Sequence, residues 1–435
     1  MNSNALFAQY SRRTFLHSTA VASVASVAAG FHGATITAAT SQQLPAVFND
    51  LKPLGDRVRP ITTEEFQGRL AHAQELMAKA SPKFEALVIG PGTSLYYFMG
   101  IRWGLSERLL ALVLPISGQP MVISPAFEEG RMRESLRFPA EVRVWQEDES
   151  PTKLIASALA DRGVRSGRIG IEETLPFTFY DHLRAVAPGF ECISADPITI
   201  GCRARKSPHE LELMRLACEA TFGVYRCVFA SVREGMTQEE IGGMVNAGFV
   251  KMKLRGGALV LLGASAALPH GSKQPQTLKE GDVVLIDGGC TVEGYESDVT
   301  RTGVLGKPSI KEQRAFETVR KAQEAALSAA RVGKLSGSVD DAARAVISSA
   351  GYGPGYKFFT HRLGHGIGLD GHEHPYLVRG SATVLEPGMT FSNEPGIYVP
   401  GEFGMRCEDD MVIVADGPAQ LLTPGFQFSL EKPLG

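Results

Sequence analysis

The sequence contains few cysteines and no strong excess of either charge, and both absences exclude whole classes of protein. Six cysteines scattered over 435 residues do not resemble the framework of a small disulfide-stabilised secreted domain, so we expect mostly free thiols. The 44 Lys and Arg residues nearly balance the 47 Asp and Glu residues, so no field that recruits nucleic acid or anionic lipid is expected. A small neutral or zwitterionic substrate agrees better with this composition.

The N-terminal segment lacks an apolar run that would form a stable membrane span of ~20 residues. Arg12 and Arg13 precede a weakly apolar run, residues 18–29, that is rich in Ala, Val, Ser and Thr. This pattern predicts a twin-arginine export signal over residues 1–40, cleaved between about Ala34 and Thr40. A disordered tail with a chance arginine pair, or a membrane anchor, is the alternative. We therefore expect a periplasmic or secreted protein without membrane contact once the signal is removed.

Helix and strand patterns alternate after the signal, and 44% hydrophobic residues are enough for ordinary globular cores. The patterns predict helices over residues 64–80, 151–159 and 177–186, and strands over residues 86–89, 95–98, 109–114, 121–123 and 168–171. They indicate a smaller α/β domain over residues 41–203. Ser207, Pro208 and Glu210 then form the cap, first position and capping box of a new helix. A second domain is therefore expected over residues 204–435.

The second domain has a repeated pattern of elements. A long helix over residues 208–232 and a helix capped by Thr237 are followed by a long helix over residues 310–332 and a helix capped by Ser338. Each pair then leads into a hairpin that carries two acidic residues. A pseudo-twofold packing of the two halves would bring these four carboxylates together.

The two hairpins place acidic residues symmetrically about their turns. A turn between Val292 and Glu293 would make Asp287 and Asp298 cross-strand neighbours, with Cβ atoms ~5 Å apart. In the second hairpin, Glu394 and Glu408 lie at equal distances from Gly401, which follows Pro400 in a turn dipeptide.

Acidic residues near turns are ordinarily solvated, but these follow aliphatic runs that predict buried strands. Four buried carboxylates cannot all ionise without cations, and two divalent ions would balance them. His365, which lies between glycines, is the natural neutral ligand. A set of oxygen ligands with one nitrogen and no thiolate favours Mn(II), with Co(II), Fe(II) or Zn(II) possible.

These motifs resemble the signature of the prolidase, aminopeptidase P and methionine aminopeptidase family. The resemblance extends over residues 207–435 and is carried by Asp287 and Asp298 and by the segments at residues 361–368, 372–375, 393–396 and 406–409. It implies an α+β protein with a pseudo-twofold pita-bread catalytic domain. The preceding domain is similar in kind to that of prolidase and aminopeptidase P.

The resemblance also implies roles for individual residues. The metal ligands would be Asp287, Asp298, His365, Glu394 and Glu408. Glu394 would also accept a proton from water, while His270, His361 and His372 would act as catalytic and substrate-binding residues. Arg406 would brace the site or bind a substrate carboxylate; a structural, salt-bridged arginine is the alternative.

The activity implied is hydrolysis of an Xaa-Pro bond in a small peptide by a dinuclear metallopeptidase, acting as a dipeptidase or as an aminopeptidase. The expected assembly is a homodimer. Two alternatives keep the fold: a hydrolase or lyase for a small non-peptide substrate, and a protein without catalytic activity. The full ligand set disfavours both, whereas Gly371 and His374 are less usual at their positions and leave the exact specificity open.

Overall fold

The computed structural model describes residues 44–424 and 428–435. The predicted export signal, with Arg12 and Arg13, lies outside these residues. Within them, no helix has both the length and the apolar character that crossing a bilayer requires. All six cysteines are free thiols, which confirms that prediction.

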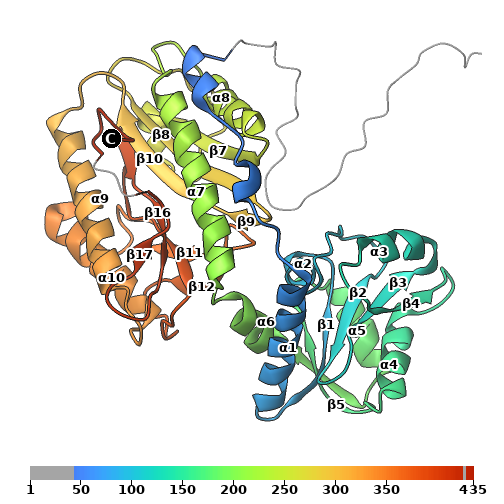
Figure 1. The fold of residues 1–435 in the computed structure, drawn as a ribbon. Helices are drawn as coiled ribbons and strands as arrows, with labels where there is room; N and C mark the ends of the chain where they lie inside the picture. Colours follow the sequence, from blue (N-terminus) through green and yellow to red (C-terminus); the bar gives the residue numbers. More distant parts are fainter. Residues whose placement is uncertain (1–43, 425–427) are drawn as a thin grey trace, which may run out of the picture. The chain divides into compact units, whose positions relative to one another are not determined.

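The N-terminal domain is built on one six-stranded mixed sheet, in the order β4-β3-β2-β1-β5-β6 (Figure 1). Its strands are β1 Phe84–Ile89, β2 Ala111–Pro115, β3 Met121–Pro125, β4 Glu141–Trp145, β5 Gly167–Ile171 and β6 Phe190–Ser194. Its helices are α1 Thr63–Lys79, α2 Thr93–Met99, α3 Glu129–Ser135, α4 Pro151–Asp161, α5 Phe177–Val186 and α6 Asp196–Arg203. The central strands β1, β2 and β3 are almost entirely buried, so this sheet forms the core of the domain.

One predicted strand of this domain is wrong. Residues 95–98 lie in helix α2, which ends at Gly100 in the left-handed conformation, with φ 68°. Five of the seven side chains of α2 are buried, so the segment has no polar face that would indicate helical periodicity. Short apolar runs of this kind do not distinguish a buried helix from a buried strand.

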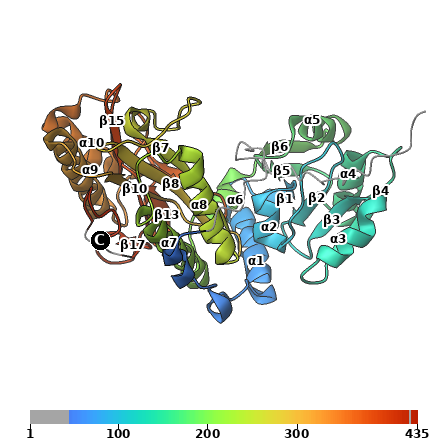
Figure 2. The ribbon, with the colours of Figure 1, turned by 90° about the horizontal axis from the view of Figure 1, so that it is seen from above.

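The C-terminal half, residues 204–435, twice shows a pair of helices followed by strands, as the sequence predicts. The first half contains α7 Pro208–Phe229, α8 Gln238–Lys251, β7 Arg255–Leu262, β8 Val283–Val292, β9 Tyr295–Glu296 and β10 Val299–Val304. The second contains α9 Ile310–Ala329, α10 Ser336–Ile347, β11 Gly364–Gly366, β12 Glu373–Leu377, β13 Thr390–Asn393, β14 Gly396–Val399, β15 Phe403–Arg406, β16 Asp409–Val412 and β17 Gln420–Leu421. Helices α7 and α8 pack on β7 and β8 (Figure 2), and α9 packs on α10.

Local capping signals correctly locate two helix starts but not a third. Ser207 and Thr237 form complete capping boxes at α7 and α8. Ser338, in contrast, lies inside α10, whose N-cap is Leu335. The backbone of Leu335 bridges Val384, and Ser336 bonds to Ser381 over 2.6 Å, so tertiary contacts begin this helix earlier.

The first hairpin closes one residue later than predicted. Val292 pairs with Tyr295, so Glu293 and Gly294 form the turn, both at positive φ (51° and 95°). Asp287 therefore lies opposite Thr300 and not opposite Asp298. The predicted cross-strand pair is wrong, because a shift of one residue changes every partner along a strand.

The second hairpin closes as predicted. Gly396 pairs with Arg406 and Val399 with Phe403, which centres the turn on Gly401. Gly401 has φ 77°, a conformation that suits glycine. Glu394 and Glu408 consequently flank the open end of this hairpin at equal distances.

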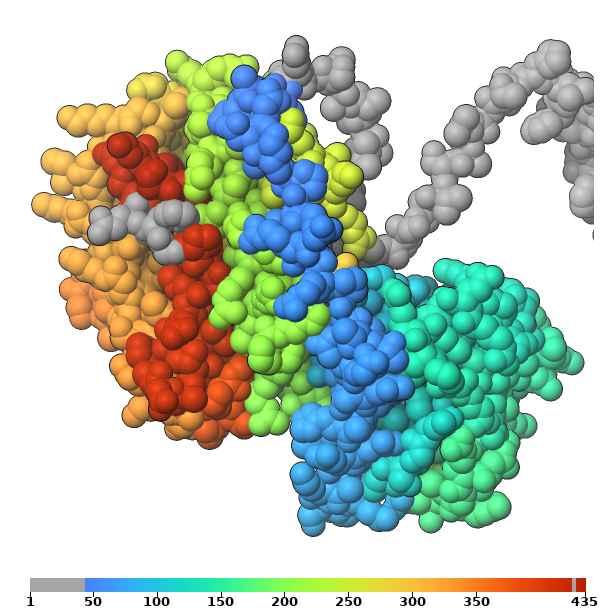
Figure 3. All heavy atoms as spheres, in the orientation of Figure 1, coloured from blue at the N-terminus to red at the C-terminus, as the bar shows by residue number. Residues whose placement is uncertain are grey.

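The first described residues pack along helix α7, as Figure 3 shows for the blue segment over the green helix. Phe48, Leu51 and Leu54 belong to the same buried core cluster as the apolar face of α7. Arg57 forms two hydrogen bonds with Glu219, at 2.7 and 2.6 Å. Residues 44–58 therefore contact the C-terminal half, although the sequence groups them with the N-terminal domain.

A buried polar contact joins α1 to the first hairpin. The Arg69 guanidinium donates to the Tyr295 hydroxyl at 2.7 Å, and that hydroxyl donates to the Glu210 carboxylate at 2.7 Å. Tyr295 lies three residues before Asp298. The N-terminal domain thus helps to fix the hairpin from which Asp298 projects.

Candidate metal-dependent active site

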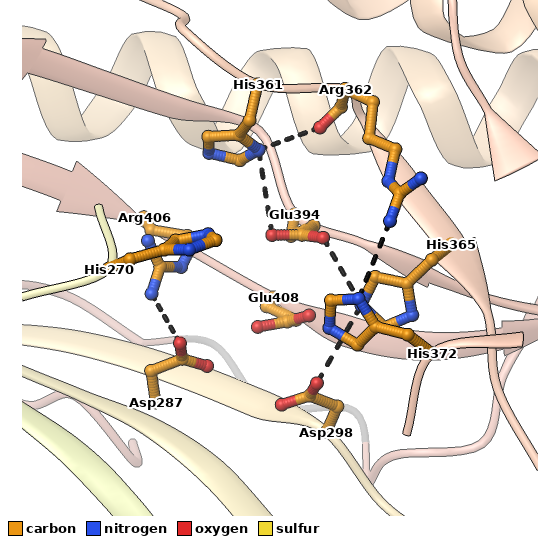
Figure 4. Close-up of a pocket in the computed structure, with 10 residues that line it drawn as sticks. All are labelled: His270, Asp287, Asp298, His361, Arg362, His365, His372, Glu394, Arg406 and Glu408. Carbon is orange, nitrogen blue, oxygen red and sulfur yellow. Dashed lines mark hydrogen bonds and ion pairs between the residues drawn. The ribbon is translucent and has the colours of Figure 1, made fainter. Parts of the chain in front are cut away.

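All of the predicted site residues line a single cavity of about 150 Å³ (Figure 4). The lining residues are His270, Asp287, Asp298, His361, Arg362, His365, His372, Glu394, Arg406 and Glu408. Arg362 is the one member that the sequence did not single out.

The candidate ligands lie where strands end or are interrupted. Asp287 is in β8, and Asp298 lies in the break between β9 and β10. His365 is in the short strand β11, Glu394 follows β13, and Glu408 lies between β15 and β16. Both hairpins therefore contribute two carboxylates, and β11 contributes the imidazole between them.

Ligand atoms from these residues lie close enough to share cations. Asp287, Asp298 and Glu408 each offer an oxygen within 4.8 Å of the others, and so do the ligand atoms of His365, Glu394 and Glu408. A third group with the same spacing joins Asp298 and His365 to His372. His372 is thus near enough to be a ligand, which the sequence analysis did not predict.

The carboxylates of this cavity are not balanced by the side chains around them. Burial, followed by the charge of Asp287, raises the pKa of Asp298 well above its usual value, and burial with Asp298 nearby does the same for Glu408. Burial raises the pKa of Glu394 to about 8. Asp287 differs, because Arg406 overcomes the effect of burial and lowers its pKa.

Thr300 joins two of the candidate ligands. Its Oγ1 lies 2.7 Å from an Asp287 oxygen and 2.6 Å from a Glu408 oxygen, and the Arg406 Nε donates to it at 3.1 Å. A hydroxyl has one proton, so it donates to only one carboxylate at a time. The other contact needs either a proton on the carboxyl, which agrees with the raised pKa of Glu408, or a nearby cation.

His365 is oriented to offer a lone pair to the same space. Its Nδ1 lies 3.1 Å from the Gly366 carbonyl, which assigns the proton to Nδ1. Its Nε2 then faces Glu394 at 3.4 Å and Asp298 at 3.8 Å without a proton to donate. Burial, then His372, lowers the pKa of His365 to about 3, so the ring is neutral, as a metal ligand must be. Metal-bound histidines are commonly held in this way through the second ring nitrogen.

Arg406 braces the site. Its guanidinium donates to Asp287 at 2.5 Å, to the Tyr398 hydroxyl at 2.8 Å and to Thr300. Tyr398 in turn lies 2.8 Å from Nε2 of His361, whose Nδ1 lies 2.8 Å from the Arg362 carbonyl. Both ring nitrogens of His361 are therefore occupied, and this histidine forms a wall of the cavity. Burial, then Arg406, lowers the pKa of His361 to about 3.

The remaining histidines lie at the more open side of the cavity. His270 and His372 are both exposed. The His372 ring stacks on His365 with centroids 3.7 Å apart. These rings are free to contact a substrate in a way that His361 is not.

Thr300 and Tyr398 were missed by the sequence analysis, although strand alternation could have identified Thr300. It lies two residues beyond Asp298 and its side chain faces the same cluster. Tyr398 acts through tertiary contacts with Arg406 and His361, for which no local pattern exists.

A second polar cluster lies directly behind the ligands, and we call Arg301, Asp409, Gln323 and Asn393 the rear cluster. Arg301 donates to Asp409 at 2.6 Å and to the carbonyl of Glu408 at 2.7 Å. Gln323 donates to Asp409 at 3.0 Å, and Asn393 donates to the Gln323 carbonyl at 2.9 Å. Three of its residues are chain neighbours of Thr300, Glu394 and Glu408, so the rear cluster fixes the backbone that carries the site.

Comparison with known proteins gives matches over both halves of the chain. The family model described as Creatinase/Prolidase N-terminal domain matches residues 69–205. The family model described as Metallopeptidase family M24 matches residues 212–415. The probable dipeptidase PepE of Mycobacterium tuberculosis is 35% identical over 364 residues, which cover 82% of this chain and 95% of the relative.

Two further comparisons agree with these matches, one with a relative whose substrate class is named and one with a solved structure. The Xaa-Pro dipeptidase of Lactobacillus helveticus is 34% identical and covers 74% of this chain and 89% of its own. The crystal structure of a prolidase from Thermococcus sibiricus superposes with a TM-score of 0.74 at 31% identity, covering 83% of this chain and 98% of that one. The expected pita-bread domain behind a smaller α/β domain is thereby confirmed.

Proposed function

This chain belongs to metallopeptidase family M24 and is a hydrolase, and we propose that it cleaves Xaa-Pro bonds in small peptides with two divalent metal ions. The observation that supports this best is the convergence of four carboxylates and one neutral imidazole in a single buried cavity. The relatives described as Xaa-Pro dipeptidase and prolidase support the choice of substrate.

The residues that would hold the two ions are Asp287, Asp298, His365, Glu394 and Glu408, whose ligand atoms form groups close enough to share a cation. Mn(II) is the proposed metal, because the set offers carboxylate oxygens and a single imidazole nitrogen. Two divalent ions bound there would polarise the scissile carbonyl and lower the pKa of a water molecule. The unbalanced carboxylates and the unprotonated His365 Nε2 support this assignment.

Side chains of the cavity carry out the remaining steps, which are proton transfer, support of the ligands and contact with the substrate. Glu394 accepts the proton of the attacking water and passes it to the leaving nitrogen. Arg406 keeps Asp287 ionised and, through Tyr398, holds His361 against the cavity wall. His270 and His372, at the open side, contact the substrate on either side of the scissile bond.

A preference for proline follows from the type of amide bond. An Xaa-Pro bond has no N–H, so enzymes that bind this hydrogen cleave it poorly. The site proposed here needs only the carbonyl oxygen and a proton for the leaving nitrogen. The pyrrolidine ring would pack against the walls formed by His361 and His372.

The test compares Ala-Pro with Ala-Ala on Mn(II)-loaded protein. We expect kcat/KM at least about tenfold higher for Ala-Pro, a difference of ~1.4 kcal/mol in the barrier. Equal rates on both peptides would reject the proline preference and leave a metal-dependent peptidase. Failure to cleave either peptide with any added divalent metal would reject the proposed activity as a whole.

We also propose that the protein is exported by the twin-arginine pathway and forms a homodimer. The first proposal is based on Arg12 and Arg13 before the weakly apolar run. Replacing both by Lys should retain active enzyme in the cytoplasm, and unchanged export in cell fractionation would reject the signal. A single species of monomer mass in light scattering would reject the dimer.

A further inference from the structure

The segment that carries His372 into the active-site cavity is held from the N-terminal domain. Arg203, the last residue of α6, donates to the carboxylates of Asp370 and Glu373, each at 2.6 Å. Thr93, the first residue of α2, donates to Asp370 at 2.5 Å. Asp370 and Glu373 lie on either side of His372, so this short segment is attached to the N-terminal domain at both of its ends.

The contact at Glu373 is buried and strongly charged. The side chain of Glu373 is 7% exposed and that of Arg203 is 11% exposed. The Lys206 ammonium, which is 2% exposed, also donates to Glu373. Solvent does not screen a buried carboxylate with two cationic partners, so it is held in place more firmly than one in a surface ion pair. Glu373 is therefore a fixed point directly after His372.

Gly371, which the sequence analysis noted as less usual, lies between Asp370 and His372 and makes these attachments necessary. A Cβ at Gly371 would meet no atom within 4 Å, so packing does not restrict this residue. Glycine also leaves the backbone more conformational freedom than any other residue. The position of the His372 ring therefore depends on how Asp370 and Glu373 are held.

His372 lies between this contact and the proposed metal ligands. Its ring stacks on that of His365, with centroids 3.7 Å apart and planes 17° apart, and Figure 4 shows the two rings side by side. His372 also lines a second cavity of about 70 Å³, which Arg203 and Glu373 line as well. A movement of the segment would therefore move the imidazole relative to the ligand set.

We propose that Arg203 is a positioning residue, which acts through Asp370 and Glu373 to hold the His372 imidazole where it contacts the substrate. This proposal rests on the proposed function. Displacing a group that contacts the substrate by about 1 Å can lower a rate about 100-fold, so the position of the ring limits its effect. The N-terminal domain thereby contributes to catalysis, although Arg203 does not line the active-site cavity.

The test is a double-mutant cycle on the hydrolysis of Ala-Pro by Mn(II)-loaded protein. Arg203→Gln should lower kcat/KM at least about tenfold, as is usual for residues that orient an active-site group. His372→Ala removes the group through which Arg203 acts, so adding Arg203→Gln to that variant should lower kcat/KM less than about twofold further. A residue that only stabilises the fold lowers kcat/KM by the same factor with and without His372. Equal factors would therefore overturn the proposal.

Three further variants separate positioning from loss of structure. Arg203→Lys keeps the charge without the planar guanidinium and should recover part of the activity. Asp370→Asn changes the same contact at a side chain that is 42% exposed, which the fold should tolerate, and should lower kcat/KM by a smaller factor. Arg205→Gln removes the exposed ion pair with Glu386 and should leave kcat/KM unchanged. Bound metal should be equal in all variants. An equal loss in Arg205→Gln, or full activity in Arg203→Gln, would overturn the proposal.

Labelling of histidines with diethyl pyrocarbonate separates this proposal from the proposed function, because it needs no turnover. Mass spectrometry follows the reaction of His372, with His270, which lies outside the segment, as the reference. In Arg203→Gln the His372 ring should leave its stack on His365 and react at least about threefold faster, since a stacked ring pair is worth about this factor. Unchanged labelling of His372 rejects the positioning role. If no peptide is cleaved, the proposed function fails and the labelling still decides whether Arg203 holds the ring.

Discussion

The two polar clusters on opposite sides of the same strands differ in how their charges are balanced. In the rear cluster, Arg301 is paired with Asp409, and Gln323 also donates to that carboxylate. In the cavity, Asp298 and Glu408 lie close to other carboxylates and have raised pKa values. Glu408 and Asp409 are chain neighbours, so strand alternation alone sends one to each cluster.

This difference distinguishes the rear cluster, whose charges support the fold, from the cavity, whose charges indicate a function. A buried charge is tolerated when an opposite charge pairs with it, and removing that partner destabilises the fold. A buried charge without an opposite charge carries a desolvation cost that no contact within the fold offsets. The fold retains several such charges in the cavity, and the simplest reason is a cation that binds after or during folding. Buried carboxylates without a positively charged partner therefore indicate a functional site more strongly than a buried ion pair does.

The largest effect is expected from Glu394→Gln, which removes both a proposed ligand and the proton acceptor. We expect kcat on Ala-Pro to fall by about 10⁴-fold, at the upper end of what general base catalysis contributes. Tm of the metal-free protein should change little at neutral pH, since Glu394 is already protonated there and the amide replaces one neutral group by another. Activity within about tenfold of the natural protein at equal metal content would exclude this role.

The second prediction contrasts two neighbouring residues in metal-free protein. Asp409→Asn leaves Arg301 buried without its counter-charge and should lower the free energy of unfolding by about 3–5 kcal/mol. Glu408→Gln removes one of several repelling carboxylates and should leave that free energy unchanged or raise it. Denaturant unfolding of both variants in chelator measures the difference. Equal destabilisation would mean that the two faces do not differ in charge balance.

The third and smallest expected effect is that the free energy of unfolding of the metal-free protein falls as pH rises. The folded protein keeps Glu394 protonated up to about pH 8, whereas its ordinary pKa is 4.5, so the folded state binds more protons in this window. The stabilisation is complete below pH 4.5 and is lost as pH rises toward 8. Between pH 5 and pH 7 one such group lowers the free energy of unfolding by about 2–3 kcal/mol. Stability that rises with pH in chelator would contradict this.

The sequence predicted best the features that depend on near neighbours. The capping boxes at Ser207 and Thr237 satisfy backbone groups within one helical turn, so a short motif identifies them. The turn at Gly401 is similar, because proline and glycine together restrict the chain locally. Some of the nine residues predicted for the site lie in short motifs of this kind, and all nine residues line the cavity.

Features that depend on distant contacts were not predictable in the same way. The first hairpin turns at Glu293, a residue with positive φ that composition does not indicate. Helix α10 begins where Ser381 and Val384 meet it, and most side chains of α2 are buried. Arg362 was missed because its place at the cavity depends on contacts with His372 and Tyr376, which only the three-dimensional structure reveals.

The packing of residues 44–58 on α7 has a consequence for the order of events during synthesis. Arg57 and its partner Glu219 are 162 residues apart. At translation rates of 5–20 residues per second, the segment waits roughly 10 to 30 s before its binding surface leaves the ribosome. Phe48, Leu51 and Leu54 are apolar side chains that cannot be buried against α7 in that interval. The start of the described chain is thus among the last parts to reach its native contacts, although it is among the first to be made.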